Sequence, residues 1–146
     1  MSKIAALAFL ALLLGTAQPA FSGEELVLIV SARSDLKQLD SSSVRKLFLG
    51  LTVTQDGTRL HPALNEADAQ IKQLFLQNIV SMSDSTYDRY VLRLSLLHGQ
   101  TQPTVYKTSS QLMDAVAADP TLVSYAWQRD VSRDGRIRAV RVLWHD

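Results

Sequence analysis

Glu25-Leu-Val-Leu-Ile-Val30 starts with one acid and continues as an unbroken apolar run that includes β-branched residues. A run this short, without alternating polar residues, is typical of a strand that is buried on both faces. Sheets with such strands carry helices on their faces, so the run predicts a strand inside a layered α/β domain.

Helix signals follow this strand along the chain. Asp40 or Ser41 can cap a short helix, and Gly50 stands where a left-handed residue ends it. Three more apolar stripes predict helices. The inward residues expected are Val44, Leu47 and Phe48 in the first helix; Ile71, Leu74, Phe75 and Ile79 in the second; Tyr87, Tyr90, Val91, Leu94 and Leu97 in a third capped by Ser83 or Ser85; and Leu112, Met113 and Val116 in a fourth that starts at Ser109 or Ser110.

Turn signals separate the remaining strands. Asp56-Gly57 marks a turn, and Arg59 to Leu64 is expected to be a short edge strand, because Pro62 cannot donate to a ladder. Leu122 to Trp127 and Ile137 to Trp144 are expected to form a hairpin around Asp134-Gly135. The order predicts one small α/β domain with a mixed β-sheet flanked by helices.

The first 22 residues have the pattern of a secretory signal peptide. Lys3 is the only charge, an apolar run from Ile4 to Leu14 follows, and Ala20-Phe21-Ser22 offers small residues to a signal peptidase. A permanent span needs about 20 apolar residues, more than this run provides. We expect cleavage after Ser22, a domain at residues 23–146, and a periplasmic or secreted protein without stable membrane insertion.

Composition narrows the function classes. The 15 basic and 14 acidic side chains nearly balance, whereas nucleic-acid binders concentrate positive charge. The chain has no cysteine, so it has neither a disulfide nor a thiolate. His61, His98 and His145 lack zinc-site spacing, and no nucleophile elbow or glycine-rich phosphate motif occurs. We expect a non-enzymatic binding module with no catalytic residues, metal or cofactor, and no nucleic-acid partner.

One loop carries candidate ligand-binding side chains. Ser31, Arg33 and Ser34 follow the first strand, and loops at the carboxyl ends of strands often bind ligands in α/β folds. These three residues could hold phosphate or another small oxyanion; the other interpretation is an ordinary polar loop. A second basic group lies near the C-terminus, where nearby acids favour a solvated strand face over an anion patch. Its arginines are Arg129, Arg133, Arg136, Arg138 and Arg141.

Seven segments, taken together, suggest a family. They are Leu26-Val-Leu-Ile-Val30, Val44-Arg-Lys-Leu-Phe-Leu-Gly50, Asp56-Gly57, Gln73-Leu-Phe75, Tyr87-Asp-Arg-Tyr90, Gly99-Gln-Thr-Gln-Pro103 and Val123-Ser-Tyr125. In this order and spacing they resemble the phosphate ABC-transporter substrate-binding proteins, in particular a short group that covers about one lobe. The resemblance implies one lobe of a type II periplasmic binding protein, with phosphate or another small oxyanion as the ligand.

The resemblance also implies where phosphate would bind, and this chain departs from the family there. The family loop resembles Arg-Ser-x-Gly-Ser-Gly-Thr and holds phosphate at a helix N-terminus. The corresponding stretch, Leu64-Asn-Glu-Ala-Asp-Ala-Gln70, lacks those donors and adds Glu66 and Asp68, which would repel an anion. We expect a degenerate phosphate site and a domain that acts through contacts with an envelope protein. The alternative is a genuine phosphate- or oxyanion-binding component of a transport system, using Ser31, Arg33 and Ser34.

Overall fold

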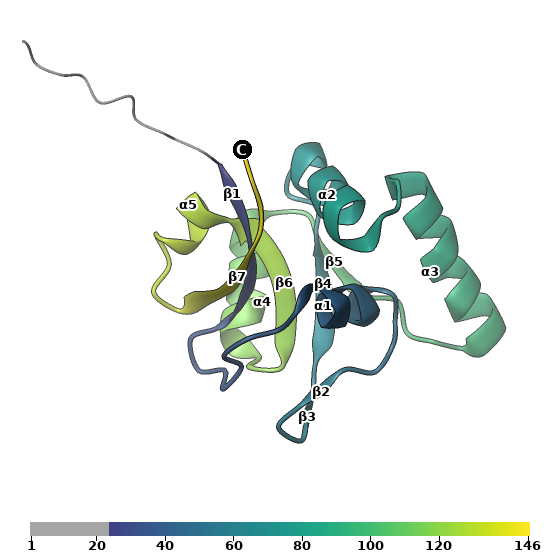
Figure 1. Cartoon of the computed structure of the whole chain (residues 1–146), viewed down its shortest axis with the longest axis horizontal. Coiled ribbons are helices and arrows are strands. Elements are labelled where there is room, and N and C mark those ends of the chain that lie inside the picture. The colour runs from purple at the N-terminus through teal and green to yellow at the C-terminus, as the bar shows by residue number, and fades with distance from the viewer. Residues whose placement is uncertain (1–23) are drawn as a thin grey trace, which may run out of the picture.

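A mixed five-stranded sheet forms the centre of the protein (Figure 1). The structure is a computed structural model that describes residues 24–146, so the predicted signal peptide, residues 1–22, lies outside the described part. The strand order is β5–β4–β6–β1–β7. β4 runs parallel to β5 and β6, whereas β1 runs antiparallel to β6 and β7. The strands are β1 (Glu25–Ser31), β4 (His61–Asn65), β5 (Thr104–Tyr106), β6 (Leu122–Trp127) and β7 (Ile137–His145).

Helices cover both faces of this sheet, which confirms the predicted fold class. One face packs on α1 (Ser41–Phe48), α2 (Ala69–Phe75) and the π-helix η1 (Leu76–Val80). The other packs on α4 (Ser109–Ala118) and α5 (Gln128–Val131). Within β1, residues 26, 28 and 30 face the first layer and residues 27 and 29 face the second. All five are buried, as expected of a strand between two helical layers.

Local sequence sets the helix ends. Asp40 caps α1, its side chain accepting a hydrogen bond from the Ser43 N–H at 3.1 Å. Gly50 follows the helix with a φ of 84°, the left-handed conformation that glycine adopts without strain. Ser83 caps α3 (Asp84–His98), and α4 starts at Ser109, both as predicted; the side chain of Thr108 caps α4.

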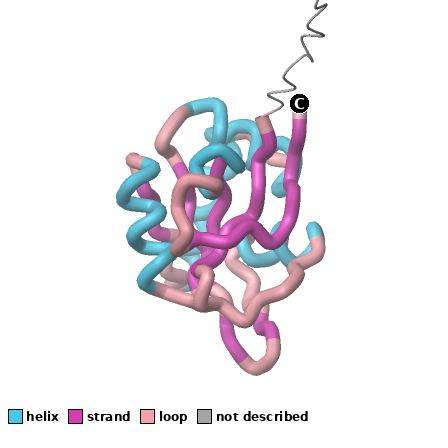
Figure 2. Tube along the Cα trace, turned by 90° about the vertical axis from the view of Figure 1, so that its left-hand side faces the viewer, coloured by secondary structure: helices cyan, strands magenta, loops and turns pink. Residues whose placement is uncertain are grey.

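A small hairpin, β2 (Thr54–Gln55) and β3 (Thr58–Arg59), stands apart from the main sheet. Asp56 and Gly57 both have positive φ angles, 50° and 79°, which a two-residue turn between twisted strands requires. The turn predicted at Asp56-Gly57 is therefore confirmed. Figure 2 shows this hairpin projecting from the body of the molecule.

The strand that contains Pro62 is not at an edge, so that prediction is wrong. β4 lies between β5 and β6. The His61 N–H donates to the Thr121 carbonyl on the β6 side at 2.9 Å, so the Pro62 nitrogen points toward β5. Pairing with β5 begins only at Ala63. Proline is tolerated here because, among the strands described, no ladder partner faces its nitrogen.

The predicted C-terminal hairpin is also wrong. β6 and β7 do not pair with each other; β1 lies between them and pairs with both. α5 and the turn at Asp134-Gly135 carry the chain from β6 across β1 to β7. A turn signal between two strands shows that the chain reverses, and it cannot show that a distant strand is inserted between them.

Two further differences concern the segment after η1. β5 has no counterpart among the predicted strands, because its three residues, Thr104 to Tyr106, are too few to show a period. Leu97, expected to face inward, is 65% exposed. Tyr87 alone among the residues of α3 is buried, so this helix is held mainly by its first turns.

Candidate functional site

The loop from Asn65 to Asp68 connects β4 to α2. It lies in the stretch that the family resemblance assigned to the phosphate loop. Asn65 is buried, and its amide donates to the Tyr125 carbonyl at 2.9 Å while its side-chain oxygen accepts from the Ala67 N–H at 2.9 Å. The Tyr125 hydroxyl returns a hydrogen bond to the Asn65 carbonyl at 3.1 Å. The loop is therefore fastened to β6 by hydrogen bonds of its own residues.

Asp68 occupies the start of α2. One of its carboxylate oxygens accepts from the Ile71 N–H at 2.7 Å, and the other accepts from the Trp127 indole N–H at 3.1 Å. A capping carboxylate satisfies a free N–H group and interacts favourably with the positive end of the helix. The position at which a helix N-terminus could receive an anion is thus filled by a side chain of the protein.

Glu66 lies between two lysines. Its Oε1 is 2.7 Å from the Lys72 Nζ, and its Oε2 is 2.7 Å from the Lys107 Nζ. Lys72 is buried and also contacts Asp88 at 3.2 Å. Glu66 was expected at the helix dipole together with Asp68; instead its carboxylate takes a place between two cations that a bound oxyanion could otherwise occupy.

Glu66, Lys72, Lys107 and Asp88 form a charge cluster in which each ion pair stabilises the charged forms of its members. Burial raises the pKa of Glu66, but hydrogen bonds from Lys107 and Lys72 outweigh it and hold that pKa below its usual value. Burial lowers the pKa of Lys72, and its hydrogen bonds to Glu66 and Asp88 reverse the direction, so the pKa is raised. The ionised forms are therefore the stable ones at neutral pH.

The structure brings Ser31, Arg33 and Ser34 together in one turn at the end of β1. The buried Ser31 hydroxyl donates to the Ala117 carbonyl at 3.3 Å and accepts from the Arg33 N–H at 3.2 Å. The Arg33 guanidinium donates to the carbonyls of Ala117 and Ala118, at 3.0 and 3.2 Å, at the end of α4. The Ser34 hydroxyl accepts from the Leu36 N–H at 3.1 Å. Each candidate side chain thus has a partner within the protein.

A pocket of about 490 Å³ opens beside this turn, lined by Ser31, Arg33, Asp114 and Arg136 among others. The Arg136 guanidinium pairs with Asp134 at 2.9 Å and with Asp114 at 3.0 Å. A side-chain hydrogen bond from Arg136 holds the pKa of Asp134 below its usual value. Both arginines of the pocket therefore have local acceptors, although Arg33 itself is exposed and could turn toward a ligand.

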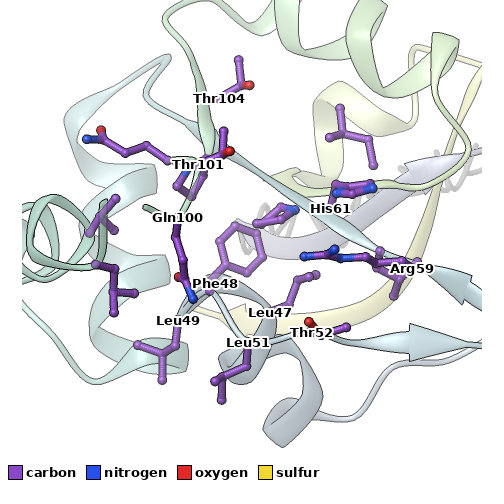
Figure 3. Close-up of a pocket in the computed structure, with 18 of the residues that line it drawn as sticks. Leu47, Phe48, Leu49, Leu51, Thr52, Arg59, His61, Gln100, Thr101 and Thr104 are labelled. Carbon is purple, nitrogen blue, oxygen red and sulfur yellow. The ribbon is translucent and has the colours of Figure 1, made fainter. Parts of the chain in front are cut away.

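A larger pocket, of about 820 Å³, lies between the end of α1, β4 and α3. Figure 3 shows Arg59 and His61 on one side of it and Gln100 and Thr101 on the other. Both the buried Phe48 and Leu51, which is 54% exposed, line this pocket. No local sequence pattern predicts this pocket, because its walls come from segments that are far apart in the chain.

Lys72 and Lys107 are the charged site residues that sequence reasoning missed. Lys107 lies 41 residues from Glu66 in the chain, and no local pattern links the two. Within residues 24–146, no group of three or more His, Asp or Glu side chains could hold a metal ion. None of the helices described here is long and apolar enough to cross a membrane.

Comparison with known proteins supports the fold. The chain is similar to a putative phosphate ABC-transporter substrate-binding protein with bound phosphate from Clostridium perfringens (TM-score 0.61, 15% identity). It is also similar to an ABC-type phosphate transport receptor from Vibrio cholerae (TM-score 0.51, 12% identity) and a possible phosphate-binding protein from Planctomyces limnophilus (TM-score 0.57, 10% identity). The expected resemblance is confirmed at the level of the fold.

The match covers only part of these larger proteins. In each case it includes 82% of this chain but 41–46% of the other, so the chain spans less than half the length of the structures it matches. This coverage is consistent with a single lobe. No protein-family model and no curated protein sequence matches the chain.

Proposed function

We propose that this protein is an exported, non-catalytic binding domain whose phosphate site is degenerate and which acts through contacts with another protein of the cell envelope. The observation that supports the proposal is the position of Asp68, which caps α2 in the loop that the family resemblance aligns with the phosphate loop. Glu66 adds a second carboxylate between Lys72 and Lys107. An incoming phosphate would meet two negative charges where it needs donors.

The length of the matched structures supports the same proposal. A substrate-binding protein of two lobes closes both around its ligand, and this chain matches less than half of such a protein. One open face gives a small anion few partners and leaves it in water. Affinity for phosphate is therefore expected to be weak even without the two carboxylates.

The second candidate function is oxyanion binding at the Ser31–Ser34 turn, as part of a transport system. Two observations favour it: Arg33 is exposed, and the pocket beside it also contains Arg136. The present contacts of Arg33 with two α4 carbonyls would have to be exchanged for the ligand. Hydrogen bonds to charged groups contribute about 1.5–3 kcal/mol each, so this exchange costs part of the binding energy.

Titration with inorganic phosphate separates the two functions. A ligand at 100 times its dissociation constant stabilises the native state by about 2.7 kcal/mol, which should raise the melting temperature by several degrees. We expect no such shift at millimolar phosphate, relative to sodium chloride of equal ionic strength. A dissociation constant in the micromolar range or below would contradict the degenerate-site proposal.

Arg33→Ala identifies the site if phosphate does bind. Loss of binding in this variant would support the Ser31–Ser34 turn and the transport function. Unchanged binding would exclude that turn. Arg141→Ala is the matched control, because Arg141 is an exposed arginine on β7 for which the described residues show no ion pair.

A further inference from the structure

α3 is the longest helix of the described chain, yet Tyr87 is its one buried residue. Two hydroxyl groups fasten its first half to the end of α1: Tyr87 donates to the Phe48 carbonyl and Tyr90 to the Leu49 carbonyl, each at 2.7 Å. Most helical stability in proteins comes from packing of an apolar face. The second half of α3 has little such packing within the described residues.

The outward side of α3 carries a regular stripe that begins at Arg89 and runs through its second half. Arg89, Leu92, Arg93, Leu96 and Leu97 stand at positions i, i+3, i+4, i+7 and i+8, which share one side of a helix. We call these five residues the α3 outer face. Its leucines are 49%, 75% and 65% exposed, in chain order. Figure 1 shows α3 at the rim of the molecule, away from the sheet. Single exposed leucines are common, whereas three on one helical stripe indicate a contact surface.

The charge on this face has one sign. Arg89 and Arg93 are its charged residues, and residues 89–98 contain no acid. Neither Arg89 nor Arg93 forms an ion pair with any residue between 24 and 146. Most acidic side chains near the candidate site, by contrast, are already paired with lysine or cap a helix. The unpaired arginines beside exposed leucines are thus complementary to a surface that alternates apolar and acidic side chains.

We propose that the α3 outer face docks an acidic amphipathic helix of a partner protein. This proposal rests on the proposed function, contact with another protein, and adds the surface through which that contact occurs. A helix laid against this stripe can place apolar residues on the three leucines and carboxylates on the two arginines. Docking would also bury the half of α3 that the fold leaves exposed.

Two other occupants fit less well. A second copy of this chain, docked through the same face, would bring four arginines together, and like charges across an interface are unfavourable. An anionic lipid surface would meet Asp88, which precedes Leu92 by one turn and is 62% exposed. A helix of a partner protein can avoid the Asp88 carboxylate, because its acidic residues stand at particular positions, whereas a lipid surface is anionic throughout.

Site-specific photo-crosslinking tests the docking surface. A photoreactive amino acid replaces Leu96, or Val142 as the matched control, in the full chain expressed in its own organism. Val142 is also an exposed aliphatic residue, 49% exposed, but lies on β7. We expect a protein adduct at position 96, several times more abundant than at position 142, whose crosslinked segment is a helix rich in acidic residues.

A second test reverses the charges of Arg89 and Arg93. Arg89→Glu with Arg93→Glu should reduce the adduct at position 96 by about tenfold, whereas Arg141→Glu should leave it unchanged. Unchanged melting temperatures would show that these surface variants fold. An adduct with lipid, with a second copy, or with a segment lacking acidic excess overturns the proposal, as does equal yield at both positions. The phosphate titration is independent of this result, so the two proposals can fail separately.

Discussion

Glu66 places each of its carboxylate oxygens on a different lysine, so a single substitution tests the charge cluster. Glu66→Gln should lower the free energy of unfolding by about 1–3 kcal/mol at neutral pH, because Lys72 and Lys107 lose charge-assisted hydrogen bonds. The pKa of Glu66 in the folded state lies below the usual value of 4.5. The stabilisation that its ionised carboxylate provides is therefore complete above pH 4.5. It is lost as the pH falls through the lower, folded pKa.

Urea unfolding of both proteins between pH 3 and pH 7 measures this difference, which should shrink on acidification. Glu24→Gln is the control, because Glu24 pairs with Arg129 at an exposed site, where ion pairs contribute about 0–1 kcal/mol. A difference that stays constant down to the lowest pH would contradict the assignment of the effect to the ionised Glu66.

At the scale of the elements, the end of α1 depends on Gly50. Its φ of 84° strains any residue with a Cβ atom, and a Cβ there would lie 2.8 Å from the Gln100 Oε1 and 3.3 Å from the Leu94 Cδ1. Gln100 is exposed and can move away, so backbone strain is the main cost. Gly50→Ala should destabilise the fold by about 1–2 kcal/mol in urea unfolding.

Gly99→Ala and Gly135→Ala complete this series. Gly99 has a φ of 63°, but a Cβ added there would have no atom of residues 24–146 within 4 Å. Its variant therefore measures the backbone strain without a steric contact. Gly135 has no left-handed φ, and no atom in the described part of the chain would lie within 4 Å of its added Cβ, so its variant should be nearly neutral. Equal stability of all three variants would show that the left-handed ends of the helices do not carry the expected cost.

Elements fixed by neighbouring residues were predictable from sequence. The face formed by Val44, Leu47 and Phe48 and the cap at Asp40 are local patterns, and the structure shows both. Strand order is not local: the insertion of β1 between β6 and β7 leaves no trace in either strand. The same reason explains the site. The sequence placed Asp68 in the loop before the second helix, but Lys107 reaches Glu66 only through the fold.

At the scale of the whole molecule, the predicted signal peptide has a direct test. If residues 1–22 are removed on export, N-terminal sequencing of protein from the cell envelope should begin at Gly23. The first strand begins at Glu25, so cleavage there would leave β1 intact. Replacing Ala20 with a bulky residue such as Trp should block processing. Envelope protein that still begins at Met1 would contradict the prediction.

The pairing of β1 with β7 brings the two ends of the described chain to the same edge of the sheet. Glu25 lies opposite His145, and the Asp146 N–H donates to the Glu24 carbonyl at 3.2 Å. A short glycine-serine linker could therefore join these ends, with new termini opened between Asp56 and Gly57 at the tip of the projecting hairpin. Such a circular permutant should fold with a melting temperature within several degrees of the parent, as thermal unfolding would show. By the same geometry, the domain could be inserted into a surface loop of another protein with its core undisturbed.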